Sequence, residues 1–417
     1  MRITTAFKRL LRLDGVTVTD VEFLSASVVV TVALRRRRLA CPECSFSTAA
    51  AYEIKRTDVS SWRHLDLGAW RLEVRAHLRR LVCPTHGVRV EAVPFARHGC
   101  RFTTDFESLV AWLATKTDKT TIGRLVRIDW DTVGRICARV VAEELDPARL
   151  DDLFEIGVDE ISWKKHHNYL TLVTDHRTRK VVWGAKGKDA AALDGFFDEL
   201  GRERSSQVTA VSMDMGPAFA KSVRAEGHAP QAVICFDPFH VIKVATDALE
   251  EVRRSIWQQL RGLPDQALAK RFKGARWALL KNPEDLSAAQ AETLARIRRN
   301  GGAAWRGYQL KEALRELFAG DLDATETMEL LDRWCSRAQR SRLAPFVKAA
   351  ATIRKHRDGI LAAIRLGISN GLIEGLNNKV RLIIRRAYGF HSAEAALALV
   401  MLSCGPVDLQ LPHERAA

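Results

Sequence analysis

The spacing of apolar side chains divides the chain into stretches of different periodicity. An apolar, β-branched run at residues 28–32, followed by four arginines at 35–38, predicts a short strand that leads into a basic turn. From residue 102 to about 145 the spacing is helical, and at residue 154 it resets into strands. From residue 239 to about 366 nearly every segment again has helical spacing, with breaks at prolines and glycines.

Residues 154–245 alternate between strand-like and helix-like segments. Three consecutive strands are predicted first, followed by a helix, a strand, a second helix and a last strand. Three meandering strands followed by strand–helix–strand connections predict a mixed sheet flanked by helices. In order, these seven segments are residues 154–163, 168–175, 180–187, 191–200, 208–214, 216–227 and 232–237.

Length and charge narrow the class of protein. A chain of 417 residues is too long for one ordinary core and suggests two to four domains. The net charge of +15 favours a polyanionic partner such as DNA, because each neutralised phosphate releases counterions; a merely soluble basic protein is the alternative. No apolar run approaches the roughly 18 residues that span a bilayer, and the first residues lack a secretory signal. We therefore expect a cytoplasmic, nucleoid-associated protein without a membrane partner.

Three of the eight cysteines, together with one histidine, have metal-ligand spacing near the N-terminus. Cys41 and Cys44 form one pair with a two-residue gap, and Cys83 and His86 form another. Such pairs let both side chains converge on one tetrahedral ion, so we expect a structural Zn²⁺ site. The alternative is four unconnected small residues in turns.

Residues 120–141 contain two short amphipathic stretches, 122–126 and 130–139, joined by three residues. This pattern is typical of a helix-turn-helix that binds DNA, and a plain helical hairpin is the alternative. Asp129 or Asp131 is expected to cap the second helix. The groove-facing candidates are Thr132, Arg135 and Arg139.

Three acidic residues have the positions expected of active-site carboxylates. Asp159 and Asp214 each end a strand-like run, and Glu374 lies on a helix-like segment, residues 369–390. Carboxylates from adjacent strands and a packed helix can hold two Mg²⁺ ions roughly 3.5 to 4 Å apart. For each aspartate taken alone, a surface residue beside a turn is the simpler interpretation. Glu160 points to the opposite side from Asp159, and alternation does not decide which of the two serves.

Side chains near these acids add chemistry suited to phosphate. Glu374, Asn378, Arg381 and Arg385 form one helical stripe, which combines a metal ligand with phosphate-binding guanidinium groups; a solvated charged face is the alternative. Asp237 and His240 follow another strand. His240 is expected either to orient a scissile phosphate or protonate a leaving group, or to have only a structural role.

In combination these motifs resemble the bacterial insertion-sequence transposases of the ISL-three type, which are DDE transposases with an RNase H-like core. The matching stretches include CPEC, RRLVCPTHG, GVDEISWKKHHNYLTLVTD, SMDMGPAF, CFDPFHVIK and SNGLIEGLNNKVRLIIRRAYGF. The resemblance implies that Asp159, Asp214 and Glu374 are the catalytic triad and that Asp237 with His240 is the element that follows the second aspartate. It also implies a helical insertion between Asp214 and Glu374, in which Trp305 or Trp334 could stack on a base.

The expected fold class is thus an α/β catalytic core with an N-terminal zinc ribbon, a helix-turn-helix and an all-α insertion. The expected domains are residues 1–100 (strands and zinc ribbon), 101–150 (helix-turn-helix), 151–245 (first part of the core), 246–365 (helical insertion) and 366–417 (last part of the core).

The predicted function is DNA transposition with Mg²⁺ or Mn²⁺ as the catalytic ion and Zn²⁺ as a structural ion. The predicted partners are double-stranded DNA, both the terminal inverted repeats and the target, and a second copy of the chain or more when bound to DNA. Two alternatives remain. One is a transposase-derived DNA-binding regulator without catalysis, and the other is an RNase H-like nuclease without strand transfer.

Overall fold

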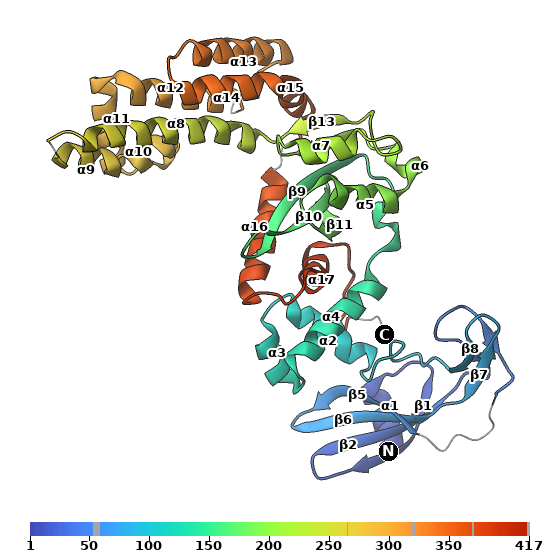
Figure 1. Ribbon diagram of the computed structural model, residues 1–417. Helices are drawn as coiled ribbons and strands as arrows, with labels where there is room; N and C mark the ends of the chain where they lie inside the picture. Colours follow the sequence, from blue (N-terminus) through green and yellow to red (C-terminus); the bar gives the residue numbers. More distant parts are fainter. Residues whose placement is uncertain (53–58, 265, 319–321, 369–370, 415–417) are drawn as a thin grey trace. The chain divides into compact units, whose positions relative to one another are not determined.

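The computed structural model describes residues 1–417 except 53–58, 265, 319–321, 369–370 and 415–417. The chain forms two compact units (Figure 1). The first contains residues 1–146, 385–388 and 398–417, and the second contains residues 147–384 and 389–397. In the part of the chain that the structure describes, none of the helices is both long and apolar enough to span a membrane.

The first unit begins with a helix and a four-stranded sheet. Helix α1 (Ile3–Leu11) precedes strands β1 (Val16–Phe23), β2 (Ser27–Leu34), β5 (Val59–Leu67) and β6 (Trp70–His77), which lie in the order β1-β2-β6-β5. The predicted strand at residues 28–32 is confirmed as the centre of β2. Valines of β1 and β2 are buried together with Leu72 and Val74, so the β-branched run forms the core of this sheet.

Three helices follow later in this unit: α2 (Thr104–Ala114), α3 (Lys119–Val126) and α4 (Trp130–Glu144). Asp118 caps α3 by accepting a hydrogen bond from Thr121 N at 2.9 Å. The turn to α4 is tight, because a Cβ at Gly123 would lie 2.6 Å from Ile128 O, and Arg127 closes it in the left-handed conformation with φ 58°. Asp129 occupies the N-cap position of α4, but its side chain makes no capping hydrogen bond, contrary to expectation.

The second unit is built on a five-stranded mixed sheet. Its strands are β9 (Glu155–Lys164), β10 (Asn168–Asp175), β11 (Lys180–Lys186), β12 (Ala210–Met213) and β13 (Val233–Phe236), in the order β11-β10-β9-β12-β13. The pairs β11–β10 and β10–β9 are antiparallel, whereas β9–β12 and β12–β13 are parallel. All five predicted strands of this region are confirmed, and so are the helices between them, α5 (Ala190–Leu200) and α7 (Pro217–Val223). A short helix, α6 (Arg202–Ser205), follows α5.

The two faces of this sheet are covered differently. Ile156, Val158 and Val211 pack with the phenylalanines of α5 in the main core. On the other face Ala210 and Cys235 pack against α15 (Arg357–Leu366). The neighbouring residues Gly157 and Ser212, and the acids that follow them, belong to this second face by strand alternation.

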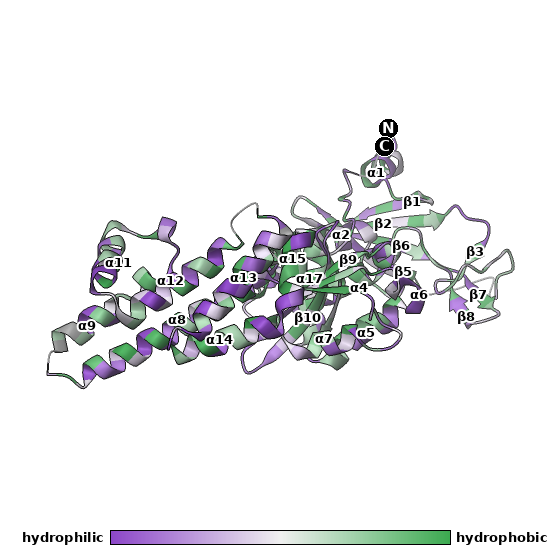
Figure 2. Ribbon diagram, turned by 90° about the horizontal axis from the view of Figure 1, so that it is seen from above, coloured by the Kyte–Doolittle hydropathy of each residue, from purple (hydrophilic) through white to green (hydrophobic). Residues whose placement is uncertain are grey.

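A helical insertion follows β13. The long helix α8 (Pro238–Arg261) packs against α12 (Gly302–Glu316) and α14 (Ala344–Lys355), and polar residues alternate with apolar ones along these helices (Figure 2). Trp334 is only 4% exposed and its indole N–H donates to Leu310 O at 2.7 Å. Trp334 is therefore a core residue and is not available to stack on a base, and Trp305 stacks on Tyr308 instead. The remaining helices are α9 (Gln266–Gly274), α10 (Arg276–Leu280), α11 (Ala288–Asn300) and α13 (Ala324–Gln339).

The chain then forms α16 (Gly371–Arg386) and α17 (Ala393–Cys404). Helix α16 lies beside β9 (Figure 1). Its buried positions Asn377, Val380 and Ile383 recur every three residues, as expected for a helix with one face against a sheet. A helix with a polar residue in this buried stripe brings hydrogen-bonding capacity to the sheet.

Candidate active site and metal centre

Asp159 and Asp214 lie at matching positions on adjacent parallel strands. Gly157 of β9 pairs with Ser212 of β12, so the residues two positions further on, Asp159 and Asp214, point from the same face of the sheet. Asp159 lies within β9, which continues to Lys164 as the predicted strand at residues 154–163 does, so the acid that ends the apolar run does not end the strand. The strand that ends is its neighbour β12, and the site lies where the parallel part of the sheet stops.

Asp159 is held from two sides. Its Oδ1 accepts a hydrogen bond from Glu160 N at 2.7 Å, and its Oδ2 accepts one from Asn377 Nδ2 of α16. Burial, and after it the negative charge of Asp214, raise the pKa of Asp159 to about 6. The sequence stripe had favoured Asn378, but that side chain accepts a hydrogen bond from Arg381 at 3.1 Å. Asn377 was missed because two consecutive asparagines do not reveal which one faces the sheet.

His240 lies between two aspartates. Its Nε2 is 2.8 Å from Asp214 Oδ1 and 3.9 Å from Asp237 Oδ2. The contact with Asp214 raises the pKa of His240, although burial opposes this effect. Asp237 is buried and caps α8 by accepting a hydrogen bond from Phe239 N at 3.1 Å. Asp237 thus orients the start of the helix that carries His240.

Glu374 lies on α16, three residues before Asn377, and its side chain lies outside the described residues. Residues three apart on a helix share one face, so the backbone position of Glu374 is on the face that contributes Asn377 to Asp159. Arg381 and Arg385 are exposed further along α16. The structure therefore brings together Asp159, Asp214, Asp237 and His240.

The predicted zinc ligands come together in the first unit. Cys41 and Cys44 lie in the turn between β3 (Leu39–Ala40) and β4 (Ser47–Thr48), and Cys83 and His86 lie in the turn between β7 (Arg80–Cys83) and β8 (Gly87–Val90). All four ligand atoms are within 4.8 Å of one another.

Their separations suit a tetrahedral ion. The Sγ atoms of Cys44 and Cys83 are 3.6 Å apart, and His86 Nδ1 is 3.5 Å from Cys83 Sγ and 3.7 Å from Cys41 Sγ. Bonds of about 2.0–2.3 Å at tetrahedral angles separate ligand atoms by roughly 3.5–3.8 Å. Desolvation opposes ionisation of Cys83, but the backbone N–H groups of His86 and Thr85 lower the pKa of its thiol to about 6. This donor set can hold Zn²⁺ with no open position.

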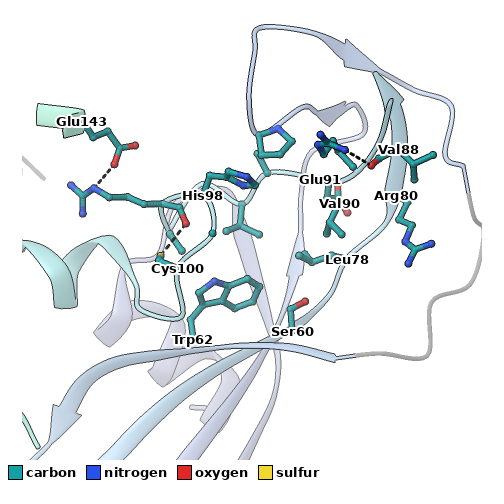
Figure 3. Close-up of a pocket in the computed structure, with 17 residues that line it drawn as sticks. Ser60, Trp62, Leu78, Arg80, Val88, Val90, Glu91, His98, Cys100 and Glu143 are labelled. Carbon is teal, nitrogen blue, oxygen red and sulfur yellow. Dashed lines mark hydrogen bonds and ion pairs between the residues drawn. The ribbon is translucent and has the colours of Figure 1, made fainter. Parts of the chain in front are cut away.

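A cavity of about 790 Å³ lies beside these hairpins in the first unit (Figure 3). Trp62 and Leu78 line its apolar part, while Glu91 and Glu143 line its polar part. Both glutamates are already paired with arginines, Glu91 with Arg79 and Glu143 with Arg97. The cavity therefore offers no converging free carboxylates and is not the catalytic site.

The three residues of the helix-turn-helix that were predicted to face a DNA groove differ in whether their side chains are available to contact DNA. Arg135 has a side chain 68% exposed and lies 3.4 Å from Asp131, and it donates to Thr132 Oγ1 at 3.0 Å. Arg139 instead donates to Glu107 Oε1 at 2.9 Å, and Glu107 is fully buried. An arginine that neutralises a buried carboxylate cannot leave it cheaply. The prediction that Arg139 faces a DNA groove is therefore not supported by its contacts.

An acidic site on a mixed sheet, together with a helix-turn-helix, is typical of DDE transposases. Comparison with known proteins leads to the same class. Residues 156–400 match a family described as "Transposase", and residues 91–141 match the "Helix-turn-helix domain of transposase family ISL3". The chain belongs to the ISL3 family of insertion-sequence transposases.

Two named relatives illustrate the similarity. The chain is 42% identical to the transposase for insertion sequence element IS1557 of Mycobacterium tuberculosis, over 97% of this chain and 96% of the relative. It is 28% identical to the transposase for insertion sequence element IS1001 of Bordetella parapertussis, over 85% of this chain and 86% of the relative. The similarity thus extends over nearly all of both chains in the first case.

The raised pKa of Asp159 makes the stability of the metal-free protein depend on pH. The folded protein retains a proton on Asp159 that the unfolded chain releases between about pH 4 and 6. The contribution of Asp159 to stability therefore falls as the pH rises through this range and is constant above it. We expect Asp159→Asn to remove this loss and to stabilise the second unit by up to about 3 kcal/mol above pH 7. Thermal unfolding in EDTA at pH 5, 6, 7 and 8 measures the effect. A difference between variant and wild type that does not change with pH would contradict the assignment.

The four-ligand cluster predicts one tightly bound zinc per chain. We expect Cys44→Ser to lose this zinc and to lower the unfolding midpoint of the first unit by roughly 10 °C, because each kcal/mol corresponds to about 2–4 °C in a unit of this size. Elemental analysis and thermal unfolding measure the two effects. Cys100→Ser is the matched control, since Cys100 donates its S–H to backbone carbonyls and lies outside the cluster. Equal zinc content in both variants would refute the site.

Proposed function

We propose that this protein binds the terminal inverted repeats of an insertion sequence and carries out Mg²⁺-dependent cleavage and strand transfer at the element's ends. Asp159, Asp214 and Glu374 are the proposed metal ligands of an RNase H-like core. The observation that carries the proposal is the shared face of Asp159 and Asp214 on adjacent strands, with α16 joined to Asp159 through Asn377.

The donor set fits a hard divalent cation. Asp159 and Asp214 offer carboxylate oxygens, the ligands that Mg²⁺ and Mn²⁺ prefer. Asp214 Oδ1 is buried and accepts no well-oriented hydrogen bond within the described residues, although His240 is close to it. Burial and the facing charge raise the pKa of Asp159, so a cation between the two carboxylates would relieve an existing repulsion.

In the proposed reaction a water oxygen forms a bond to the phosphorus at the element's end, and the bond from phosphorus to the element's 3′ oxygen breaks. The freed 3′ hydroxyl then attacks a phosphodiester of the target DNA in line. Bound Mg²⁺ ions would activate the attacking oxygen and stabilise the leaving one. The contact with Asp214 raises the pKa of His240, which favours a role for its imidazole in donating a hydrogen bond or a proton to the leaving oxygen. Arg381 and Arg385, exposed on α16, would hold backbone phosphates.

The first unit is the proposed reader of the DNA ends. Thr132 and Arg135 are exposed or partly exposed near the start of α4, which is where a recognition helix contacts bases. Zn²⁺ held by the two hairpins would stabilise the neighbouring fold and play no part in the chemistry. We propose that each domain expected from the sequence is also a functional unit of the chain.

Transposition joins two ends, so we propose at least a homodimer on DNA.

A DNA-binding regulator without catalysis is disfavoured by the preserved geometry of the two aspartates, and a nuclease without strand transfer is disfavoured by the presence of a separate helix-turn-helix unit. One assay distinguishes the three, with purified protein, Mg²⁺ and a labelled fragment that carries the element's end. Cleavage with joining supports the transposase, cleavage alone the nuclease, and binding alone the regulator.

Asp214→Asn should abolish the chemistry and leave DNA binding nearly intact, because the amide keeps the shape of the side chain but cannot hold a cation. We expect single-turnover cleavage to fall by at least about 10³-fold, with the Kd for the end fragment changed less than about 2-fold. Asp198→Asn is the matched control, since Asp198 is exposed on α5. Equal loss of binding and cleavage in Asp214→Asn would count against the assignment.

Arg135→Ala should weaken recognition of the element's end. The expected loss is about 5- to 100-fold in affinity, which corresponds to one lost contact with a base or phosphate. Titration of the end fragment and of an unrelated duplex, each at several salt concentrations, separates these cases: a base contact reduces the preference for the end, and a phosphate contact reduces the salt dependence. Arg202→Ala, in an exposed arginine outside the helix-turn-helix, should bind like wild type. Unchanged affinity in Arg135→Ala would remove α4 from the proposed interface.

A further inference from the structure

A cavity of about 310 Å³ opens beside Asp214, and Asp159 is not among the residues that line it. Its apolar part comes from α7 and α8 and includes Phe219 and Val244. Its polar part contains two lysines and two further carboxylates. The complete lining is Glu160, Lys188, Asp214, Met215, Gly216, Ala218, Phe219, His240, Lys243, Val244 and Asp247. The cavity is therefore continuous with the proposed catalytic residues Asp214 and His240.

The two lysines of this cavity differ in their partners. Lys243 Nζ lies 2.9 Å from Asp247 Oδ2 within α8, so its charge is largely neutralised. Lys188 makes no ion pair within 4.0 Å of a described carboxylate, and its ammonium lies 4.2 Å from the centroid of the Tyr169 ring. An aromatic ring restrains an ammonium group without neutralising it. Lys188 thus brings an available positive charge to a cavity that is otherwise mostly acidic.

The backbone before Lys188 is fixed by specific contacts. Gly187 has φ +124°, and a Cβ at this position would lie 3.0 Å from Ala192 Cβ, so the turn requires glycine. Gly187 N donates to Tyr169 O at 3.0 Å, and Thr171 Oγ1 donates to Gly187 O at 3.0 Å. The end of β11 is therefore pinned to β10, and Lys188 is directed toward the cavity that it lines.

Bound Mg²⁺ would not remove the need for this lysine. A DNA strand that passes through the proposed site has a negative charge at each phosphate. The wall beside Asp214 has Glu160 and Asp214 to repel it, whereas Asp247 is paired with Lys243. A cation on this wall offsets that repulsion where the strand enters or leaves. An ammonium already held over a ring also loses little side-chain freedom on binding.

We propose that the cavity beside Asp214 is a phosphodiester-binding subsite and that Lys188 positions the phosphate next to the scissile one. This inference rests on the proposed function, and it adds a residue that neither the sequence motifs nor the comparisons assign. Lys188 acts here as a positioning residue, because it holds the DNA backbone and does not contact the reacting atoms.

The test pairs Lys188→Met with DNA in which single phosphates around the cleavage point are replaced by uncharged methylphosphonates. We expect Lys188→Met to slow single-turnover cleavage about 10- to 100-fold and to make the salt dependence of binding shallower by about one phosphate contact. One methylphosphonate should slow wild-type cleavage by a similar factor and leave the variant unaffected. Such non-additivity identifies a direct contact. Lys188→Arg should recover most of the rate.

Lys180→Met is the control, because Lys180 is exposed at the opposite end of β11. It should behave like wild type with every substrate. Effects of Lys188→Met and of each methylphosphonate that simply add would overturn the proposal, as would wild-type rates in Lys188→Met. The same cycle is measured by affinity in Ca²⁺, where no cleavage is needed. A coupled loss of affinity there would support the subsite even if the wild-type protein failed to cut in Mg²⁺, an outcome that would refute only the proposed function.

Discussion

Two carboxylates face each other across adjacent parallel strands, and the rest of the candidate site is organised around their repulsion. Asp159 and Asp214 share a face because β9 and β12 are in register, and the burial of Asp159 weakens the screening of its charge by water. The protein compensates with Glu160 N–H, the Asn377 amide and the His240 imidazole. These groups orient the acids but supply at most one positive charge. The arrangement is consequently suited to a cation and is less stable without one.

The surplus of basic residues has more than one use. Arg97 and Arg139 surround the fully buried Glu107, so these two charges stabilise the junction between the segment after the hairpins and the helix-turn-helix. Arg135 and Lys188, by contrast, leave their charge accessible on a helix start and on a cavity wall. The net charge of +15 therefore indicates a polyanionic partner without identifying which residues contact it. That distinction depends on the partner of each basic group: Arg97 and Arg139 neutralise the buried Glu107, whereas Arg135 pairs only with the exposed Asp131.

The two cysteine-bearing hairpins illustrate a different constraint. Strands β3 and β4 have two residues each, and a hairpin of this size is not stable alone. Among the described residues, a small apolar cluster of Leu39, Leu81 and Phe46 packs beside the sulfur atoms. A metal that joins the two turns would replace the hydrophobic core that these segments lack. A metal that joins the two turns would thus explain both the close spacing of each ligand pair in the sequence and the small size of the hairpins.

The sequence by itself determined the elements and the types of chemistry. Periodicity located the strands of the mixed sheet, because a side chain's exposure alternates with the local backbone, and ligand spacing located the Cys and His pairs, because two-residue gaps act within one turn. The tertiary structure decided the features of the site that depend on contacts between residues far apart in the sequence. It showed that Gly157 of β9 pairs with Ser212 of β12, that Asn377 and not Asn378 reaches Asp159, and that Arg139 is bound to Glu107. Strand register, the rotation of a packed helix and the pairing of charges are set by contacts between residues far apart in sequence, and no local pattern encodes them.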